Sequence, residues 1–598
     1  MRASITYYWN KGRRSYGSSY QTILVRAFAL FNSRSKWVSS GAVGSMSPAT
    51  EEAFQQYYLD FLNGTAIDYC TTRELPNATH WCEPDWGVEM RRDSENIDTM
   101  RRSTAFIAAA TLSLDPKHAG TVLPDGRSVS EHHTRWEAWY YAWTRWFATH
   151  GLFEELGSSY WPRTWGCVFN LLDLPPSARV RARARMLVDI AMVEAEQGSQ
   201  NGFRVGQKSR AKRDTSREAL PFTMYVNLSS QFYGENLSEA PQPFDRIINQ
   251  EAGSYEMSNV SILMHLFGAA PDTGGVYTVK NRMVGEQDAE HFGFCPPKSS
   301  SALLQEKFCN DTGRTSPCQC AHNTQGIIAQ PPYNDPVPFR ANSRQVSYIH
   351  FTPSFSMSGV LFSPNHFFAG GSQQRWTGLV FSNANSTTLG LRHLTGEKWA
   401  LVDQGVMIAQ KCASCNYGGE PSVDLFQTSG YWQQGDWTFV AANGTLEGDA
   451  YAAVRPAWGG ASLTEVKNPR NPPIFSLVPR DPWAPLIIIA GRATDFASGE
   501  AFAKEVLAAP LSVHQDSWQR KTVALEWRGK RLEFYPNTVL GQFRLPTINA
   551  VPVNDQPDKV YDGPHLEATM GSSLVTARYK DYVIEYDFAK DEIRRAFE

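Results

Sequence analysis

Hydrophobic residues recur at helical spacing between about residue 47 and residue 270. Ser47-Pro48 pairs an N-cap residue with a proline at the first helical position, and it precedes an amphipathic run at 51–62. Ser128 and Glu131 have the spacing of a capping box and open another helix. Similar periodic runs cover 95–114, 165–174, 179–197 and 257–268. Because short turns rich in Pro and Gly separate these runs, the pattern predicts antiparallel helical hairpins.

The pattern changes beyond about residue 345 to short β-rich runs separated by turn residues. These runs cover 359–364, 375–383, 398–411, 436–442, 485–494, 522–537 and 572–588. Alternating polarity and hairpin signals such as Arg528-Gly529-Lys530 predict a large antiparallel β-sandwich.

The two patterns predict an α+β multidomain fold. We expect a helical domain at 47–270, a cysteine-containing connector at 271–344 and an antiparallel β-sandwich domain at 345–598. Residues 1–46 form a segment with no clear structural interpretation. The 598 residues, 42% of them hydrophobic, suffice for more than one core.

Charge and hydropathy limit the classes of partner. The chain has 57 basic and 60 acidic residues and a formal charge of -3, so it gives no electrostatic reason to expect nucleic acid as a main partner. No long uncharged apolar run suggests a membrane-spanning helix. The apolar stretch at 21–31 is interrupted by Arg26 and is not interpreted as a signal peptide.

Cysteines and glycosylation acceptors favour the secretory pathway. Asn-X-Ser/Thr triplets begin at Asn63, Asn77, Asn227, Asn236, Asn259, Asn310, Asn385 and Asn443. Cysteines lie close together at Cys70 and Cys82, at Cys412 and Cys415, and at Cys295, Cys309, Cys318 and Cys320, which leaves Cys167 as the expected free thiol. Disulfides and a secreted protein are therefore expected. The rival interpretation of Cys412, Cys415, Cys318 and Cys320 is a zinc site.

One tryptophan-rich segment leads into candidate chemistry. Trp136, Trp139, Trp143 and Trp146 share one helical face, which normally means core packing. After His150-Gly151 the chain turns, and Glu154, Tyr160, Trp161 and Arg163 follow within a short segment. Polar and aromatic groups at the mouth of a helical hairpin suit a binding pocket.

These motifs resemble a known family. Ser94-Glu95-Asn96 at a helix start, the tryptophan-rich helix, and Glu154 with Tyr160 six residues later are similar to the helical toroid of the heparinase II/III-like and alginate-lyase-like polysaccharide lyases. The runs at 348–360, 370–376, 396–411 and 561–588 resemble their β half. The resemblance covers about residues 90–598. It implies an N-terminal incomplete (α/α) toroid followed by a C-terminal antiparallel β-sandwich.

The resemblance also implies a reaction, namely β-elimination on a uronate-containing, acidic polysaccharide. In the family an asparagine neutralises the substrate carboxylate, a role that falls to Asn96 here, and this favours proton removal beside that carboxylate. The family tyrosine, here Tyr160, delivers or exchanges protons. We expect no cofactor and assign no metal ligands.

This sequence departs from the family at one position. The family often has His directly after the asparagine, whereas Ile97 cannot accept a proton. Either Tyr160 serves as both base and acid, or a histidine from the β half completes the site, with His366 as first candidate and His350 as second. The residues expected to bind substrate are Glu95, Glu154, Trp161, Arg163, His350, Gln374 and Arg375.

Other interpretations remain open. Asp93, Glu95, Asp98, Glu154 and Glu155 offer carboxylate pairs for a glycoside hydrolase on the same scaffold, and a non-catalytic carbohydrate-binding protein is the third hypothesis. Asp93 and Ser94 also suit a helix cap. The arginines at 179, 181, 183 and 185 fit a solvated helix surface or a face that steers polyanions.

Overall fold

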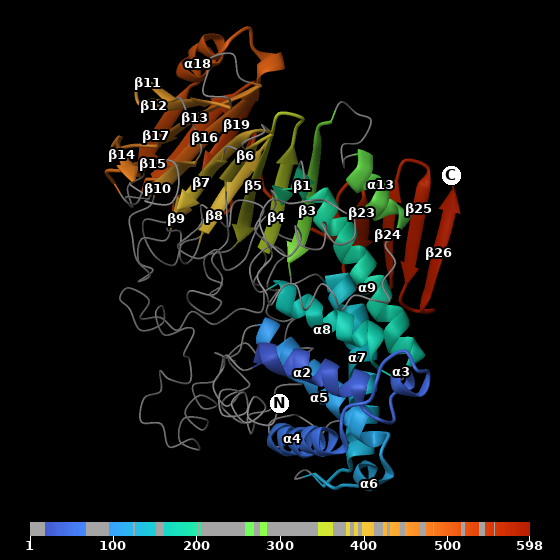
Figure 1. The fold of residues 1–598 in the computed structure, drawn as a ribbon. Helices are drawn as coiled ribbons and strands as arrows, with labels where there is room; N and C mark the ends of the chain where they lie inside the picture. The colour runs from blue at the N-terminus through green and yellow to red at the C-terminus, as the bar shows by residue number, and fades with distance from the viewer. Residues whose placement is uncertain are drawn as a thin grey trace.

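The structure is a computed structural model of the whole chain. It describes residues 18–66, 95–123, 126–150, 161–175, 177–200, 203–204, 258–267, 275–283, 345–362, 378–382, 388–392, 398–411, 422–426, 431–442, 449–466, 474–481, 484–515, 521–536, 544–554 and 557–597. Helices occupy one part of the molecule and antiparallel sheets the other (Figure 1). Among the described helices, none combines the length and apolar character needed to cross a membrane.

The helical unit is built mainly from the first 200 residues. Its helices are α2 (Ser18–Phe31), α3 (Lys36–Ser39), α4 (Pro48–Ala66), α5 (Glu95–Ser113), α6 (Pro116–Ala119), α7 (Val129–His150), α8 (Trp161–Asp173) and α9 (Ala178–Gln197), joined later in the chain by α13 (Asn259–Phe267). A two-stranded ribbon, β1 (Ser199–Gln200) and β2 (Phe203–Arg204), follows α9.

Local capping explains where several helices begin. The amide of Thr50 bonds the Ser47 hydroxyl at 3.3 Å ahead of α4. The expected capping box is present at α7, because the Glu131 amide bonds the Ser128 hydroxyl at 3.2 Å and the Ser128 amide bonds the Glu131 carboxylate at 2.7 Å. Ser177 caps α9 in the same way. The hydrogen bonds at Ser47 and Ser128 confirm the helix starts predicted from the sequence.

The tryptophan face of α7 packs in the helical core. Trp136, Trp139 and Trp143 are buried, and Trp139 stacks on Trp143 with ring centroids 5.9 Å apart. The stripe is therefore scaffold at these three positions, as expected; the side chain of Trp146 lies outside the described ones.

Residue contacts fix the directions of the helices. Arg102 lies over the Trp139 ring at 5.2 Å, and Ser113 Oγ is 3.4 Å from His133 Nδ1, so α5 and α7 run antiparallel. Phe147 near the end of α7 packs against Trp165 near the start of α8, at 6.1 Å between ring centroids. α8 packs on α5 and, through a short loop, reverses into α9. It follows that α5 and α8 are parallel and that α7 and α9 run the other way.

The largest sheet is antiparallel and includes both ends of the β half. Its strands are, in spatial order, β14 (Ala461–Val466), β15 (Ile474–Pro479), β10 (Ser422–Phe426), β7 (Thr388–Arg392), β6 (Gly378–Phe381), β5 (Phe355–Phe362), β4 (Gln345–Phe351), β3 (Tyr277–Met283), β22 (Lys559–Asp562), β23 (Leu566–Thr569), β24 (Leu574–Tyr579), β25 (Tyr582–Asp587) and β26 (Glu592–Phe597). β3 lies in the range 271–344, for which a connector was expected. It is instead a strand of the largest sheet, because it pairs with β4 on one side and β22 on the other.

Two further layers complete the β half. A second antiparallel sheet has the order β11 (Tyr431–Gln434), β12 (Trp437–Ala441), β13 (Ala450–Pro456), β16 (Leu486–Arg492), β9 (Val406–Lys411) and β8 (Lys398–Asp403). The third comprises β17 (Leu511–Gln515), β18 (Lys521–Trp527), β19 (Lys530–Phe534), β20 (Thr547–Ile548) and β21 (Val551–Pro552). Between β16 and β17 lie the short turn η2 (Ala493–Asp495) and the helix α18 (Gly499–Ala508).

Strand alternation explains why the second sheet is covered on both faces. Along β16, Ile488 belongs to the core shared with Phe355 and Met357 of the largest sheet. Ile487 and Ile489 point the other way, into a core with α18 and the third sheet. The β half is therefore an antiparallel sandwich with an additional outer layer.

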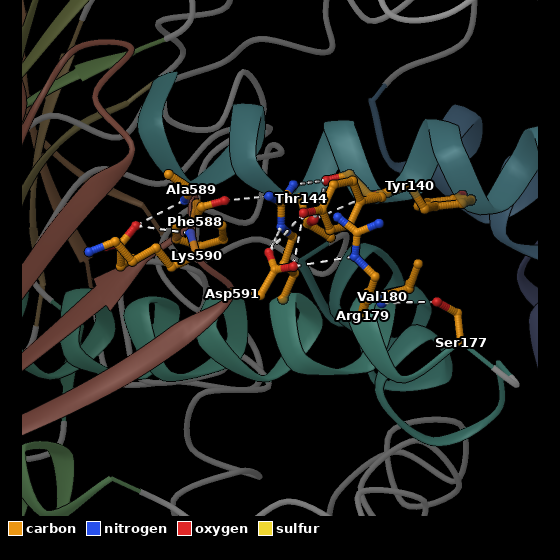
Figure 2. A network of polar contacts seen from close by, with 12 residues as sticks. Tyr140, Thr144, Ser177, Arg179, Val180, Phe588, Ala589, Lys590 and Asp591 are labelled. Atoms are coloured by element: carbon orange, nitrogen blue, oxygen red, sulfur yellow. Dashed lines mark hydrogen bonds and ion pairs between the residues drawn. The ribbon is translucent and has the colours of Figure 1, made fainter.

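The C-terminal strands pack on the helices. Tyr561, Leu566, Val575 and Tyr586 from β22–β25 belong to the same buried core as α5, α7, α8 and α9. In the turn before β26, Asp591 accepts hydrogen bonds from Arg183 Nε at 2.6 Å and from the Tyr141 hydroxyl at 2.8 Å. Figure 2 shows Asp591 with Arg179 and the preceding segment Phe588–Lys590. We call Arg183, Tyr141 and Asp591 the clasp.

The clasp shows that neither interpretation of the α9 arginines applies to Arg183. Arg183 is 4% exposed, and its two terminal nitrogens donate to the backbone carbonyls of Tyr141 and Phe588. Its guanidinium also lies over the Tyr141 ring at 3.4 Å. Arg183 is thus a buried link between helices and sheet, and neither solvation nor polyanion steering describes it.

Helical packing also begins earlier in the chain than expected. α2 contains the apolar stretch at 21–31, and its Val25 and Phe28 are fully buried. Arg26, which interrupts that stretch, is buried too and reaches Asp173 Oδ2 at 2.6 Å. Residues 18–46 therefore contribute to the helical unit, because the charge in the apolar run is neutralised by a partner on α8.

Candidate functional site

The contact between the helical unit and the largest sheet is the place where the site elements meet. The amide of Gly571, in the turn between β23 and β24, donates to the Thr149 carbonyl in the last turn of α7 at 2.9 Å. The last turns of α9 meet β3, where Asn281 Nδ2 donates to Glu194 Oε1 at 3.1 Å. We call this region the junction. It is the end of the unit at which α7 and α9 finish.

The parallel course of α5 and α8 brings both of their first turns to this same end. α5 begins at Glu95 and includes Asn96, and α8 begins at Trp161 and includes Arg163. Their backbones thus lie at the junction end of the unit. The side chains of these four residues lie outside the described ones, and so do Glu154, Tyr160, His366, Gln374 and Arg375 entirely.

Helix orientation gives the junction a defined electrostatic character. The first turns of α5 and α8 place the positive ends of two helix dipoles at this end of the unit. Such ends favour negatively charged groups, including carboxylates.

The end of α9 carries buried acidic and amide groups. Glu194 and Glu196 are 8% and 5% exposed, and Gln197 is fully buried. Acidic groups in the last turn oppose the helix dipole, so they cost free energy at this position. The Asn281 amide offsets part of that cost at Glu194.

Two buried tyrosines of the sheet lie within the electrostatic influence of these carboxylates. The Tyr277 hydroxyl donates to the Gln197 carbonyl at 3.3 Å. Burial raises the pKa of Tyr277, and the nearby charge of Glu196 raises it further. Burial likewise raises the pKa of Tyr561, with Glu194 adding to the effect. Both phenols stay protonated at neutral pH, so they hold the junction together and do not act as bases.

A glycine and a histidine complete the contact. A Cβ atom at Gly563 would lie 2.5 Å from Gln197 Oε1, so a larger residue here would require the buried Gln197 side chain to move. His565 Nδ1 lies 3.0 Å from the Arg578 carbonyl, which assigns the proton to Nδ1. The His565 ring stacks on Tyr579 at 5.6 Å. These groups pack closely where the sheet meets the end of α9.

The sequence did not single out this support. Tyr277 and Asn281 lie in the range that was expected to be a connector. The last residues of α9 have the sequence of an ordinary polar helix end. The one local signal was the pair of acids in the last turn of α9, where a helix disfavours them. Tyr561, Gly563 and His565 belong to the C-terminal run that resembles the lyases.

His350 lies on the other face of the sheet. Tyr277 and Asn281 point to α9, and the register of β3 against β4 sets Thr278 opposite His350. His350 therefore faces the second sheet, where the charges of Asp403, Arg492 and Lys530 act on it. It is 6% exposed, and burial lowers its pKa to about 4. The structure does not bring His350 to the junction.

The sequence suggested thiol or metal chemistry at several cysteines. Cys167 is a free, buried thiol, as predicted, and burial raises its pKa to about 12. The cysteines of the predicted disulfides, and of the rival zinc site, lie outside the described residues. Within the described ranges, no three His, Cys, Asp or Glu side chains converge as ligands for a metal ion.

Comparison with known proteins gave few matches. No family model matches the chain, and no curated protein matches it. Among solved structures, a heparinase III gene product is 8% identical, with 84% of each chain covered and a TM-score of 0.18. Heparan sulfate lyase HepC from Pedobacter heparinus is also 8% identical, with 86% of this chain and 98% of that one covered and a TM-score of 0.17. TM-scores of this size do not indicate a shared fold, so the function of this chain is inferred from its own sequence motifs and packing.

Proposed function

We propose that this protein is a polysaccharide lyase that cleaves a uronate-containing polysaccharide by β-elimination, on an incomplete helical toroid joined to a β-sandwich. The observation that carries the proposal is the parallel packing of α5 and α8. It supports the proposal because α5, whose first turn includes Glu95 and Asn96, and α8, which begins directly after Tyr160 in the sequence, then start at the same end of the helical unit.

In this proposal the positive potential at the junction stabilises the transition state for proton removal. Removal of the proton beside the uronate carboxylate builds negative charge on that carboxylate, and donors that meet this charge lower the barrier. Asn96 is the proposed side-chain donor, and the helix starts add positive potential at the same end. Tyr160 is proposed to remove the proton and then to protonate the leaving glycosidic oxygen.

Several assignments are proposed from sequence motifs alone. Glu95, Glu154, Trp161 and Arg163 are proposed to bind the sugar chain at the junction, with Gln374 and Arg375 contributing from the β half. Because His350 faces the second sheet, His366 is the histidine that we retain as an alternative base. A secreted protein that needs no cofactor remains part of the proposal.

The proposal is tested by ultraviolet absorbance during incubation with alginate, polygalacturonate and heparan sulfate, since elimination leaves a conjugated double bond. We expect an increase with at least one polymer. Tyr160→Phe should abolish it because only the phenolic oxygen is lost, and Asn96→Ala should slow it by about two orders of magnitude, as for loss of an oxyanion donor. Circular dichroism of both variants should match that of the wild type.

Two outcomes would contradict this assignment. Near-normal turnover by Tyr160→Phe would remove Tyr160 from the mechanism. New reducing ends without an absorbance increase would indicate hydrolysis, the reaction expected of a carboxylate pair.

A further inference from the structure

A charged pocket opens at the third sheet, which packs with α18 on the face of the second sheet opposite the largest sheet. Its volume is about 400 Å³, and it lies between the end of α18, the β18–β19 hairpin and Asn549. This volume falls in the range of sites for small ligands. We call it the hairpin pocket.

The hairpin presents its basic side chains on a fixed turn. Arg528 and Gly529 have φ of 47° and 78°, the conformation of a two-residue turn that matches the twist of the strands. Arg528 Nε donates to Glu505 Oε1 at 2.8 Å, and its guanidinium lies over the Phe496 ring at 4.5 Å. The guanidinium is thereby held at the mouth of the pocket.

Arg531 is held from the other side. Its backbone amide donates to Asn549 Oδ1 at 2.9 Å, and its guanidinium bonds Glu533 at 3.0 Å and Glu526 at 3.3 Å. Arg528 and Arg531 are 42% and 47% exposed. Both guanidinium groups are therefore positioned by the fold while much of their surface meets solvent.

The composition of the lining favours an acidic sugar. The charged lining residues are Arg528, Lys530, Arg531, Glu505 and Glu526. Lys530 is paired with Asp403 at 2.6 Å, so Arg528 and Arg531 are the cations offered to a ligand. Exposed ion pairs contribute little stability, so a ligand carboxylate or sulfate can take the place of Glu505 or Glu526 on a guanidinium. Arginine binds such groups in a bidentate manner. Sugar hydroxyls can in turn donate to the released carboxylates.

We infer that the hairpin pocket is an accessory binding site for a short acidic segment of a polysaccharide, separate from the junction. The inference rests on the proposed function for the identity of the polymer. Arg528 and Arg531 bind the acidic groups, and Glu505 competes with the ligand for Arg528. A long chain is thereby retained on the protein at a second point.

Affinity electrophoresis through gels containing alginate, polygalacturonate or heparan sulfate tests this site. All proteins carry Tyr160→Phe, so that the polymer stays intact. Retardation of this parent by at least one polymer is expected, and adding Arg528→Ala and Arg531→Ala should weaken the affinity about tenfold, the loss of charged hydrogen bonds. The matched control is Arg34→Ala with Arg594→Ala, which removes two arginines of 47% and 43% exposure elsewhere and should not change the affinity.

A variant that binds the polymer more tightly provides a second test, because a misfolded protein would bind it more weakly. Arg528 pairs with Glu505 at 2.8 Å and with Asp495 at 3.8 Å. Glu505→Gln removes the nearer of these two competing carboxylates, so it should bind the same polymer several-fold more tightly. The inference is overturned if no polymer retards the parent, if the pocket variant behaves like its control, or if Glu505→Gln leaves the affinity unchanged. Specific loss of binding in the pocket variant, with no elimination product from the wild type, would instead overturn the proposed function alone.

Discussion

Cys167 is sealed inside the helical core, where Thr22 Oγ1 of α2 lies 4.0 Å from its sulfur. Burial raises the pKa of the thiol to about 12, against the smaller opposite effect of hydrogen bonds with Ser103 and Thr22. The reactive thiolate is therefore almost absent at neutral pH. We expect iodoacetamide to spare Cys167 in the folded protein and to modify it after unfolding without reductant.

The same mass-spectrometric experiment bears on the predicted disulfides. The remaining eight of the nine cysteines should stay unmodified until a reductant is added. Modification of Cys412 or Cys415 before reduction would contradict a disulfide between them, and rapid modification of Cys167 in the folded protein would contradict its burial.

His350 predicts a pH dependence of stability. Its pKa is about 4 in the folded protein and 6.5 when exposed, so the unfolded chain binds the proton more tightly. The contribution of neutral His350 is complete above about pH 6.5 and is lost progressively as the pH falls to about 4, by about 3 kcal/mol. Tyr348, Asp403, Arg492 and Lys530 share this environment.

Urea unfolding midpoints between pH 4 and pH 8 measure this contribution. Replacement of the imidazole in His350→Asn should flatten the decline below pH 6.5 relative to the wild type. His514→Asn is the matched control, since His514 is exposed on β17. Parallel declines in the wild type and His350→Asn would show that His350 does not titrate in this way.

The clasp is the element-scale link between α7, α9 and the turn before β26. Arg183 is 4% exposed, so removal of Asp591 would leave a buried positive charge without this carboxylate partner. Asp591→Ala should therefore lower the free energy of unfolding by about 3 kcal/mol. The measurement is the thermal or urea unfolding transition reported by helical circular dichroism.

A matched ion pair provides the control for the clasp. Asp436 pairs with Arg455 at 3.2 Å but is 67% exposed. Asp436→Ala should thus cost less than about 1 kcal/mol. If Asp591→Ala costs no more than Asp436→Ala, the clasp does not hold the C-terminal strands on the helices.

Elements whose signals are local could be predicted from the sequence. The capping residues Ser47 and Ser128 predicted the starts of α4 and α7. The alternation of hydrophobic and polar residues predicted hairpins such as β18–β19. Elements that depend on distant partners could not. Arg26 finds Asp173 only in the folded chain, and β3 is recognisable as a strand through its pairing with β4 and β22.

At the scale of the whole molecule, the candidate site follows from how the helical unit meets the sheet. The sequence motifs named Asn96 and Tyr160 as candidates, and at these positions the structure describes only the helix that includes Asn96, α5, and the helix that begins directly after Tyr160, α8. The sequence did not predict which face of the sheet a side chain of β4 occupies, because neighbouring residues along a strand point to opposite faces. The sequence therefore proposed His350 for the junction, whereas its side chain lies on the opposite face of the sheet from Tyr277 and Asn281.

The central claim is that the polymer is cleaved by elimination, and the fate of water tests it most directly. Digestion of the uronate polymer in water enriched with heavy oxygen, followed by mass spectrometry, distinguishes the two reactions. Elimination predicts unsaturated products that carry no solvent oxygen at the cleaved bond and weigh one water less than hydrolysis products. Products that contain heavy oxygen at the new end would contradict a lyase and establish hydrolysis.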